Sequence, residues 1–340
     1  MPTTSAFESD IAQEPAALRA LASNRLPEAL ASLDLDSYER IVLTGMGASL
    51  VASHPTWSSM VAEGRPAWWV STAQLLAMPE LVTPRSLLWV TSQSGESGEV
   101  VALLGGHGGT RPPATLLATT NQPQSTLGEA ADVVVELHFG EEAAVSTKSY
   151  IATLAAHDRA LGSLRHQDDA RAAERIYAVA DELERFAPDV APIVHSGLVS
   201  PGARFAFVAM PSDLATAQIA ALLFNEVAKF PAEAFLTGEF RHGPIELAGP
   251  GLVCLLFGSG DENASLATLG TELVRSGALV MAVDAGELGP QWPVKTGTSS
   301  QLGRLACGAK LVQLLSAEVA RGLGIEPGHF LFGQKVTVAI

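Results

Sequence analysis

Short apolar runs recur along the chain and alternate with segments of helical spacing. Runs bounded by Gly, Pro and hydroxyl residues are typical of strands that are buried on both faces of a parallel sheet. Strands are expected at residues 41–43, 67–70, 86–90, 114–118 and 133–137, and again at residues 203–210, 252–257 and 278–283. Helices are expected between them, including residues 150–164 and 214–230. The alternation predicts an α/β protein with parallel sheets.

The pattern occurs twice in the chain. An offset of 165 residues relates Leu43 to Val208, Ser94 to Ser259 and Thr119 to Asp284. Three elements in phase indicate an internal duplication. The two copies differ, because the second copy carries Asp261 and Glu262 where the first copy has a hydroxyl-rich loop. These carboxylates would repel a phosphate, so we expect one ligand site per chain, built on the first copy.

Changes in composition suggest where the domains begin and end. A charged helical segment at residues 167–187 is followed by a stretch rich in Pro and Gly. Such a stretch is typical of a boundary between domains. We therefore expect the following order: a helical arm at 1–34, a first domain at 35–165, a helical linker at 166–190, and a second domain at 191–340. The second domain is expected to end in a strand-like tail at residues 333–338.

Composition narrows the classes of function. The net charge of −15 comes without a basic face, which argues against nucleic acid as a partner. No apolar run approaches the roughly 20 residues that span a bilayer, and no secretory signal is apparent, so no membrane partner is expected. Cys254 and Cys307 lack CxxC spacing, which favours core packing in a reducing, cytoplasmic compartment.

No cofactor or metal is expected. His and carboxylate residues do not cluster with the spacing of metal ligands. The Gly45-Met46-Gly47 segment has two of the glycines of a dinucleotide fingerprint, but Leu50 stands where the third would fall. A dinucleotide-dependent dehydrogenase is therefore the least favoured of the enzyme classes.

One loop has an unusual number of hydroxyl groups. The strand expected at 86–90 leads into Ser92-Gln93-Ser94-Gly95-Glu96-Ser97 and then into a helix. In doubly wound sheets, ligands bind outside the carboxyl ends of the strands. Hydroxyl and backbone N–H donors without Lys or Arg suit a phosphate that is held by hydrogen bonds. The alternative is an ordinary polar turn.

Three later side chains offer acid–base or carbonyl chemistry. Glu226 lies on the apolar face of its expected helix near the C-terminus, where burial and the helix dipole disfavour a charge. It is either a general base or a surface carboxylate paired with Lys229. His242 precedes a Gly-Pro pair and so lies on a turn, as a proton donor or as an ordinary surface His. Lys335 in the tail is either a solvated charge or an amine that meets a sugar carbonyl.

In combination, these motifs resemble those of the tandem sugar isomerase (SIS) domain family. The likeness is to the isomerase half of glucosamine-6-phosphate synthase and to SIS-type glucosamine-6-phosphate deaminases, and it runs from Glu14 to Val338. It is carried by Ser-Gln-Ser-Gly-Glu at 92–96, Glu-Glu at 141–142, Ser-Thr-Lys at 146–148, Glu226, Ala-Glu-Ala-Phe at 232–235 and His-Gly-Pro at 242–244. The resemblance implies two doubly wound, flavodoxin-like α/β/α domains.

The resemblance also implies a cofactor-independent isomerase of a hexose or hexosamine 6-phosphate, with or without loss of ammonia. The residues implied to bind this substrate are Ser92, Gln93, Ser94 and Ser97 at the phosphate, with Ser49 and Ser146 beside the sugar. His242 would open the ring, Glu226 would move a proton between C1 and C2, and Lys335 would lie by the open-chain carbonyl. In this family the His reaches a neighbouring chain's site, which implies a homodimer with a shared site.

The chain departs from the synthase pattern at several positions. Ala48 replaces a Thr, Ile219 and Leu223 replace charged residues, Ala-Met-Pro-Ser at 209–212 replaces Gly-Arg-Gly, and Lys335 is one residue out of register. No Cys precedes Cys254, so glutamine-dependent synthesis is not expected. The main alternative to an enzyme is a non-catalytic regulator that binds a sugar phosphate.

Overall fold

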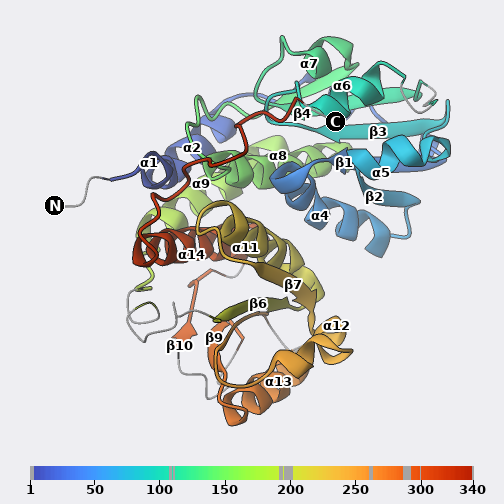
Figure 1. Ribbon diagram of the computed structural model, residues 1–340. Coiled ribbons are helices and arrows are strands. Elements are labelled where there is room, and N and C mark those ends of the chain that lie inside the picture. The colour runs from blue at the N-terminus through green and yellow to red at the C-terminus, as the bar shows by residue number, and fades with distance from the viewer. Residues whose placement is uncertain are drawn as a thin grey trace. The chain divides into compact units, whose positions relative to one another are not determined.

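The computed structural model describes residues 4–106, 109, 112–190, 194, 202–259, 263–285, 292–298 and 300–338. It contains two five-stranded parallel sheets, each flanked by helices (Figure 1). The first-sheet unit consists of Gln13–Glu142, Ser146–Ala180 and Leu331–Ile340, and the second-sheet unit of Met1–Ala12, Ala143–Val145 and Asp181–Phe330. Each unit thus includes a segment from the far end of the chain. The expected domain boundaries at residues 35, 166 and 191 stay predictions.

The first sheet has the strand order β2-β1-β3-β4-β5. Its strands are β1 (Arg40–Gly45), β2 (Ala67–Ser71), β3 (Ser86–Thr91), β4 (Thr115–Thr120) and β5 (Val133–Glu136). The central strand β3 is buried along its whole length, as its apolar run predicted. Because the chain passes from β1 outward to β2 and then returns to β3, the order reverses between β1 and β3. Such a switch point opens a crevice at the carboxyl ends of the strands.

Helices cover both faces of this sheet. They are α2 (Glu14–Ser23), α3 (Glu28–Ala31), α4 (Gly47–Ala62), α5 (Thr72–Ala77), α6 (Gly98–Leu104), α7 (Thr126–Ala130) and α8 (Lys148–Leu164). Val42 and Val90 pack towards α5, α6 and α7. Trp89 points to the opposite face, where its ring stacks on His157 of α8 at 4.5 Å. Alternate residues of the strands therefore supply two apolar layers.

The second sheet repeats the topology of the first. Its order is β7-β6-β8-β9-β10, formed by β6 (Arg204–Ala209), β7 (Ala232–Leu236), β8 (Leu252–Phe257), β9 (Leu279–Val283) and β10 (Trp292–Val294). The first four strands of the two sheets begin at residues 40, 67, 86 and 115, and at 204, 232, 252 and 279. The expected fold of two flavodoxin-like domains related by duplication is confirmed.

Two strands of the second sheet were not predicted from the sequence. They are β7 and β10, the two edge strands, which carry the exposed residues Glu233 and Pro293. One side of an edge strand makes no hydrogen bonds to a neighbouring strand, so edge strands tolerate charged residues and Pro. Their runs of apolar residues are therefore harder to recognise in the sequence.

The helices of the second-sheet unit follow the same plan. They are α1 (Ala6–Ala12), α11 (Leu214–Glu226), α12 (Thr237–Arg241), α13 (Asn263–Arg275) and α14 (Gln301–Gly322), and α9 (Asp169–Arg185) leads into the unit. Short 3-10 turns occur at Leu35–Ser37, Pro79–Leu81, Pro211–Asp213 and Pro244–Leu247. The helix expected at 214–230 is too long, because α11 ends at Glu226 and Lys229 adopts a positive φ of 53°.

The expected strand-like tail is wrong. Residues 333–338 are irregular, with a bend at Lys335 and Val336 and no strand pairing. The carbonyl of Thr337 instead accepts a hydrogen bond of 2.9 Å from the backbone N–H of Gly98. Cys254 and Cys307 are both buried, as core packing predicted. None of the helices in the described part of the chain has the length and apolar character that crossing a bilayer requires.

Candidate functional site

The residues 92–97, here called the hydroxyl loop, follow β3 at the switch point of the first sheet. The backbone of the loop is fixed where it begins, since the Ser92 N–H donates to the carbonyl of Thr119 on β4 at 3.0 Å. β1 ends beside it at Gly45, where a Cβ would lie 2.7 Å from the carbonyl oxygen of Thr91. Gly45 therefore lets the two strand ends approach closely. Ser49, in the first turn of α4 and half-buried, follows directly from this junction.

Hydrogen bonds inside the hydroxyl loop determine what its side chains can offer. The Ser92 hydroxyl oxygen accepts from the N–H of Gly95 at 3.1 Å, and that of Ser94 accepts from the N–H of Glu96 at 3.2 Å. A hydroxyl that accepts through a lone pair can still donate its proton to an oxyanion. Ser97 is the N-cap residue of α6, but its side chain makes no capping hydrogen bond.

The hydroxyl of Thr91, which immediately precedes the loop, turns inward. It lies 2.9 Å from Nε2 of the buried His157. Burial lowers the pKa of His157 to about 3, so this imidazole is neutral near neutral pH. The Thr91 hydroxyl is thus part of the support beneath the loop.

Asn121, at the end of β4, links the hydroxyl loop to the segment that follows β5. The carbonyl of Gln93 accepts from the N–H of Asn121 at 3.1 Å and from the hydroxyl of Thr120 at 3.3 Å. The Asn121 side chain donates to the carbonyl of Gly140 at 2.9 Å and accepts from the N–H of Phe139 at 3.3 Å. The backbone N–H and the side chain of Asn121 therefore join the segments that follow β3, β4 and β5.

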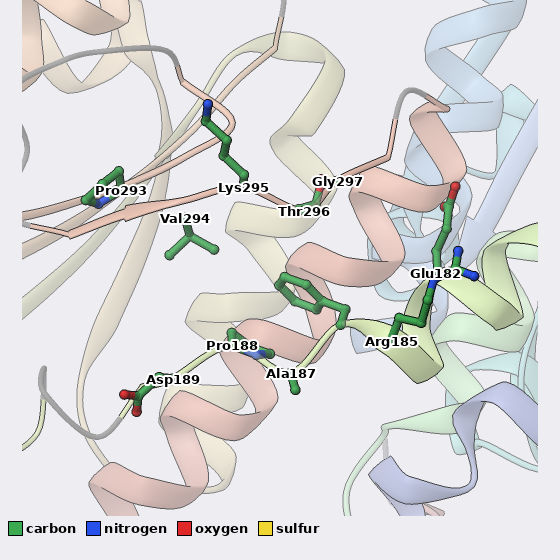
Figure 2. A pocket seen from close by; sticks show the side chains of 11 residues that line it. Glu182, Arg185, Ala187, Pro188, Asp189, Pro293, Val294, Lys295, Thr296 and Gly297 are labelled. Carbon is green, nitrogen blue, oxygen red and sulfur yellow. The ribbon is translucent and has the colours of Figure 1, made fainter.

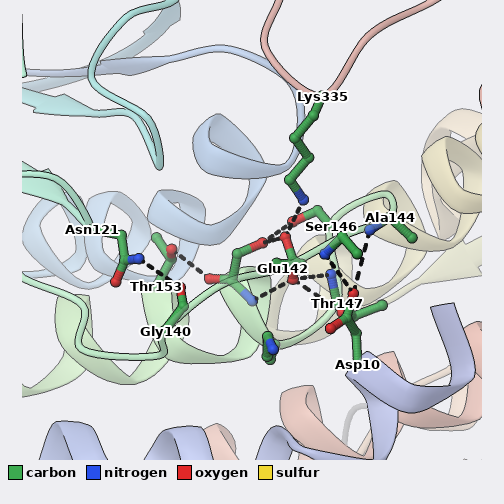
Figure 3. A network of polar contacts seen from close by, with 12 residues as sticks. Asp10, Asn121, Gly140, Glu142, Ala144, Ser146, Thr147, Thr153 and Lys335 are labelled. Atoms are coloured by element: carbon green, nitrogen blue, oxygen red, sulfur yellow. Dashed lines mark hydrogen bonds and ion pairs between the residues drawn. The ribbon is translucent and has the colours of Figure 1, made fainter. Parts of the chain in front are cut away.

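Beyond β5, Glu142 gathers a polar cluster, here called the Glu142 hub, that consists of Glu142, Thr147, Ser149 and Lys335 (Figure 3). One carboxylate oxygen, Oε1, accepts from the N–H and hydroxyl of Thr147 at 2.9 and 3.0 Å and from the N–H of Ser149 at 2.9 Å. The other, Oε2, accepts from the Ser149 hydroxyl at 2.7 Å and pairs with Nζ of Lys335. The Glu142 side chain has no exposed area.

The Glu142 hub links two of the residues predicted for the site, Lys335 within the hub and Ser146 beside it. The hydroxyl of Ser146 lies 2.6 Å from that of Ser149, so Ser146 and Lys335 meet through the same carboxylate. No sequence pattern assigns Glu142 a role of its own, since its partner Lys335 is 193 residues away. The Lys of the Ser-Thr-Lys motif, Lys148, is buried and donates to Oε1 of Gln13 at 2.6 Å.

Glu226 and His242 belong to the second-sheet unit. Glu226 is the last residue of α11 and is half-buried. Nζ of Lys229 donates to the backbone carbonyl of Glu226 and to that of His329, the latter at 2.7 Å. Burial lowers the pKa of Lys229, and the negative charge of Glu226 opposes that change. The printed contact of Lys229 is thus to the backbone oxygen of Glu226, and pairing of Lys229 with the Glu226 carboxylate stays a prediction.

His242 lies on a turn, as expected. It follows α12, is exposed, and donates its backbone N–H to the carbonyl of Glu239 at 3.0 Å. Gly243 after it has a φ of 131°, which a residue with a Cβ rarely adopts. The roles implied for Glu226, His242 and Lys335 in chemistry stay predictions.

The corresponding end of the second sheet carries charged side chains that pair with one another. Asp213 accepts from the hydroxyl of Ser212 at 2.5 Å, and its carboxylate lies 3.7 Å from Nε of Arg304. Burial raises the pKa of Asp213, and the Ser212 and Arg304 contacts partly offset that rise. Asp284 accepts from the N–H of Thr296 at 2.9 Å. Asp261 and Glu262, expected here from the sequence, lie outside the described residues.

A hollow of about 560 Å³ lies in the second-sheet unit between the end of α9 and the segment that includes β10 (Figure 2). Its charged lining combines two cations and two anions: Arg185, Lys295, Glu182 and Asp189. None of the residues predicted for the site lines it. Its mixed charge does not favour an anionic ligand over a cationic one.

Comparison with known proteins finds similar sequences and similar structures. Residues 198–290 match the family described as the SIS domain. The glutamine–fructose-6-phosphate aminotransferase (isomerizing) of Oceanobacillus iheyensis is 31% identical over 220 residues, which cover 60% of this chain and 35% of that protein. The chain thus spans about a third of the length of such curated relatives.

Two solved structures share the fold over almost the whole chain. The C-terminal domain of glucosamine-fructose-6-phosphate aminotransferase from Francisella tularensis has a TM-score of 0.83 at 17% identity, covering 96% of this chain and 99% of that one. Glucosamine-6-phosphate deaminase from Thermotoga maritima has a TM-score of 0.74 at 20% identity, with 98% and 99% covered. These structures show the same fold, and the resemblance to tandem SIS proteins that the motifs of this chain indicate is confirmed by the SIS-domain match at residues 198–290.

Proposed function

We propose that this protein is a cofactor-independent phosphosugar isomerase that acts on a hexose or hexosamine 6-phosphate. The observation that carries the proposal is the hydroxyl loop at the switch point of the first sheet. Its hydroxyls accept hydrogen bonds from the loop's own N–H groups and retain their protons for an oxyanion. Ser49 follows the neighbouring strand β1 and Ser146 follows β5, while Lys335 reaches Glu142 from the tail.

The relatives favour the same class of ligand. The enzymes that this chain resembles are named for fructose 6-phosphate and glucosamine 6-phosphate. Both ligands combine a phosphate monoester with a sugar that opens to a carbonyl form. The net charge of −15 repels a phosphate at long range, so binding has to depend on local hydrogen bonds. The neutral hydroxyl and N–H donors of the loop can supply such hydrogen bonds.

The proposed mechanism assigns one step to each reactive side chain. Ser92, Gln93, Ser94 and Ser97 hold the phosphate, and Ser49 lies by the sugar. His242 transfers a proton between ring oxygen and hemiacetal hydroxyl, which opens the ring. Glu226 then removes the proton from C2 or C1 and the carbonyl oxygen gains a proton, which gives an enediol. Return of a proton to the adjacent carbon, with loss of the proton from the other enediol hydroxyl, forms the new carbonyl. Lys335 lies beside that carbonyl.

Replacing Glu226 by Gln tests the mechanism. Glu226→Gln keeps the shape of the side chain and removes the base, so we expect turnover to fall by at least about 10²-fold while sugar-phosphate binding persists. Hexose and hexosamine 6-phosphates are followed by NMR for product, and binding is followed by thermal shift. Glu233→Gln, an exposed change on β7, is the matched control. Undiminished turnover in Glu226→Gln would exclude this carboxylate as the base.

A non-catalytic regulator is the second candidate, because SIS-type sugar-phosphate sites can serve recognition alone. It predicts that the same ligands raise the melting temperature of the wild type without any product. Loss of ammonia from a hexosamine phosphate, in place of simple isomerisation, is distinguished in the same NMR panel. The homodimer with a shared site stays a prediction from the resemblance.

A further inference from the structure

We infer that Glu142 is a positioning residue, which holds the Lys335 amine and the Ser146 hydroxyl in place at the carboxyl end of the first sheet. This inference rests on the proposed function, in which Lys335 and Ser146 lie beside the sugar. It assigns Glu142 a role that the sequence motifs did not indicate.

The geometry separates Glu142 from direct contact with a substrate. Its side chain has no exposed area, and five donors from Thr147, Ser149 and Lys335 converge on its two oxygens. A carboxylate offers about four lone-pair positions, so these donors use its full acceptor capacity. Glu142 can therefore influence a reaction only through the groups that it holds.

Those groups include two of the predicted site residues. A continuous path runs from the Ser146 hydroxyl to the Ser149 hydroxyl at 2.6 Å, from there to Glu142 at 2.7 Å, and on to Nζ of Lys335. Figure 3 shows Lys335 reaching down to this cluster from the tail. Removing the carboxylate thus disturbs both ends of the path at once.

Polar contacts hold the tail more than apolar packing does. Phe332 is 99% exposed and Val338 is 69% exposed, so apolar packing contributes little on either side of the lysine. A second polar anchor is the carbonyl of Thr337, which accepts from the N–H of Gly98 at 2.9 Å. This N–H belongs to the residue after Ser97, so the tail is attached next to the hydroxyl loop. The hub and this anchor together restrict where the Lys335 amine lies.

Glu142→Gln is the direct perturbation. Gln has nearly the same shape, but it replaces an acceptor oxygen by an NH₂ group and removes the negative charge. Donors then face donors, and Lys335 loses its charge-assisted hydrogen bond. The matched control is Glu141→Gln, which removes the neighbouring charge from an exposed side chain.

The first measurement does not depend on activity. Amines are acylated with N-hydroxysuccinimidyl acetate at pH 8, and modification of Lys335 is quantified by mass spectrometry, with the exposed Lys295 as internal reference. We expect Lys335 to react about tenfold faster in Glu142→Gln than in the wild type or Glu141→Gln. Equal reaction rates in all three proteins would overturn the inference. If Glu142→Gln does not fold by circular dichroism, Glu142→Asp replaces it, with an expected increase of about threefold.

The second measurement uses the sugar-phosphate assay. We expect Glu142→Gln to lower kcat at least about tenfold with KM changed less than about threefold, and Lys335→Met to add no further loss to Glu142→Gln. Unchanged kcat in Glu142→Gln, with an active wild type, would overturn the inference and leave the proposed function intact. A wild type that converts no sugar phosphate would refute the proposed function, while the acylation result still decides whether Glu142 holds Lys335.

Discussion

Gly95, inside the hydroxyl loop, is the position where the smallest substitution should disturb the proposed site most. It has a φ of +67°, and a Cβ there would lie 1.9 Å from Oγ and 2.6 Å from Cβ of Ser125. Ser125 is the N-cap of α7, where its side chain accepts from the N–H of Gly128 at 3.2 Å. Gly95→Ala therefore adds backbone strain and also displaces a helix cap.

Gly64 provides a matched control, because it has a φ of +76° and nothing lies within 4 Å of the position that a Cβ would take there. Gly64→Ala should cost about 1 kcal/mol, the strain of a left-handed backbone alone. Gly95→Ala should cost about 1 kcal/mol for the same strain and about 1 kcal/mol or more for the displaced cap, so about 2–3 kcal/mol in all. Urea unfolding measures both values on the same protein.

A double substitution isolates the overlap. Ser125→Gly removes both clashing atoms and costs only a few tenths of a kcal/mol at an N-cap. Gly95→Ala combined with Ser125→Gly should therefore return to a cost close to that of Gly64→Ala. Binding of a hexose 6-phosphate should weaken in Gly95→Ala and stay unchanged in Gly64→Ala. The predicted overlap is disproved if Gly95→Ala is no more destabilising than Gly64→Ala, or if Ser125→Gly gives no recovery.

Two further predictions concern buried polar groups. Because burial lowers the pKa of His157 from 6.5 to about 3, the folded state binds fewer protons than the unfolded state, and stability should fall as the pH drops from 6.5 towards 3. Urea unfolding from pH 7 to pH 4 measures how the free energy of unfolding changes with pH, to which His157 should contribute up to about 1.4 kcal/mol per pH unit. His157→Gln should lose this contribution, and His329→Gln, a control at an exposed site, should keep it. Equal pH dependence in the two variants would contradict the prediction. The Gln313 amide is fully buried and makes no hydrogen bond within the described residues. Gln313→Met should therefore raise the free energy of unfolding, measured with urea, by about 1–3 kcal/mol. A lower free energy of unfolding in the variant would count against this prediction.

Much of the fold could be predicted because its signals are local. The buried run of β3 and the hydroxyls that follow it are neighbours in sequence, so strand, loop and helix start could be placed together. The duplication was visible for a similar reason, since three elements, marked by Leu43, Ser94 and Thr119, recur 165 residues later. Edge strands such as β7 gave a weaker signal because charge is tolerated there.

The site was only partly predictable, because its hydrogen-bond partners come from distant segments. Glu142 and Lys335 are 193 residues apart, and no pattern in the sequence relates a carboxylate after β5 to an amine in the tail. The inward turn of Thr91 towards His157 likewise depends on how α8 packs on the sheet. α11 ends at Glu226, and Lys229 shortly after it has a positive φ. A positive φ is uncommon for Lys, so the residue type does not predict it.

The proposed function requires this protein to move a proton between C1 and C2 of a phosphorylated sugar. That proton transfer can be observed by incubating the wild-type protein with fructose 6-phosphate in D₂O and following the hydrogens at C1 and C2 by NMR. We expect deuterium at these carbons, together with an aldose product, and loss of both in Glu226→Gln. Binding of the sugar phosphate by the wild type with neither deuterium incorporation nor aldose product would contradict the proposed function.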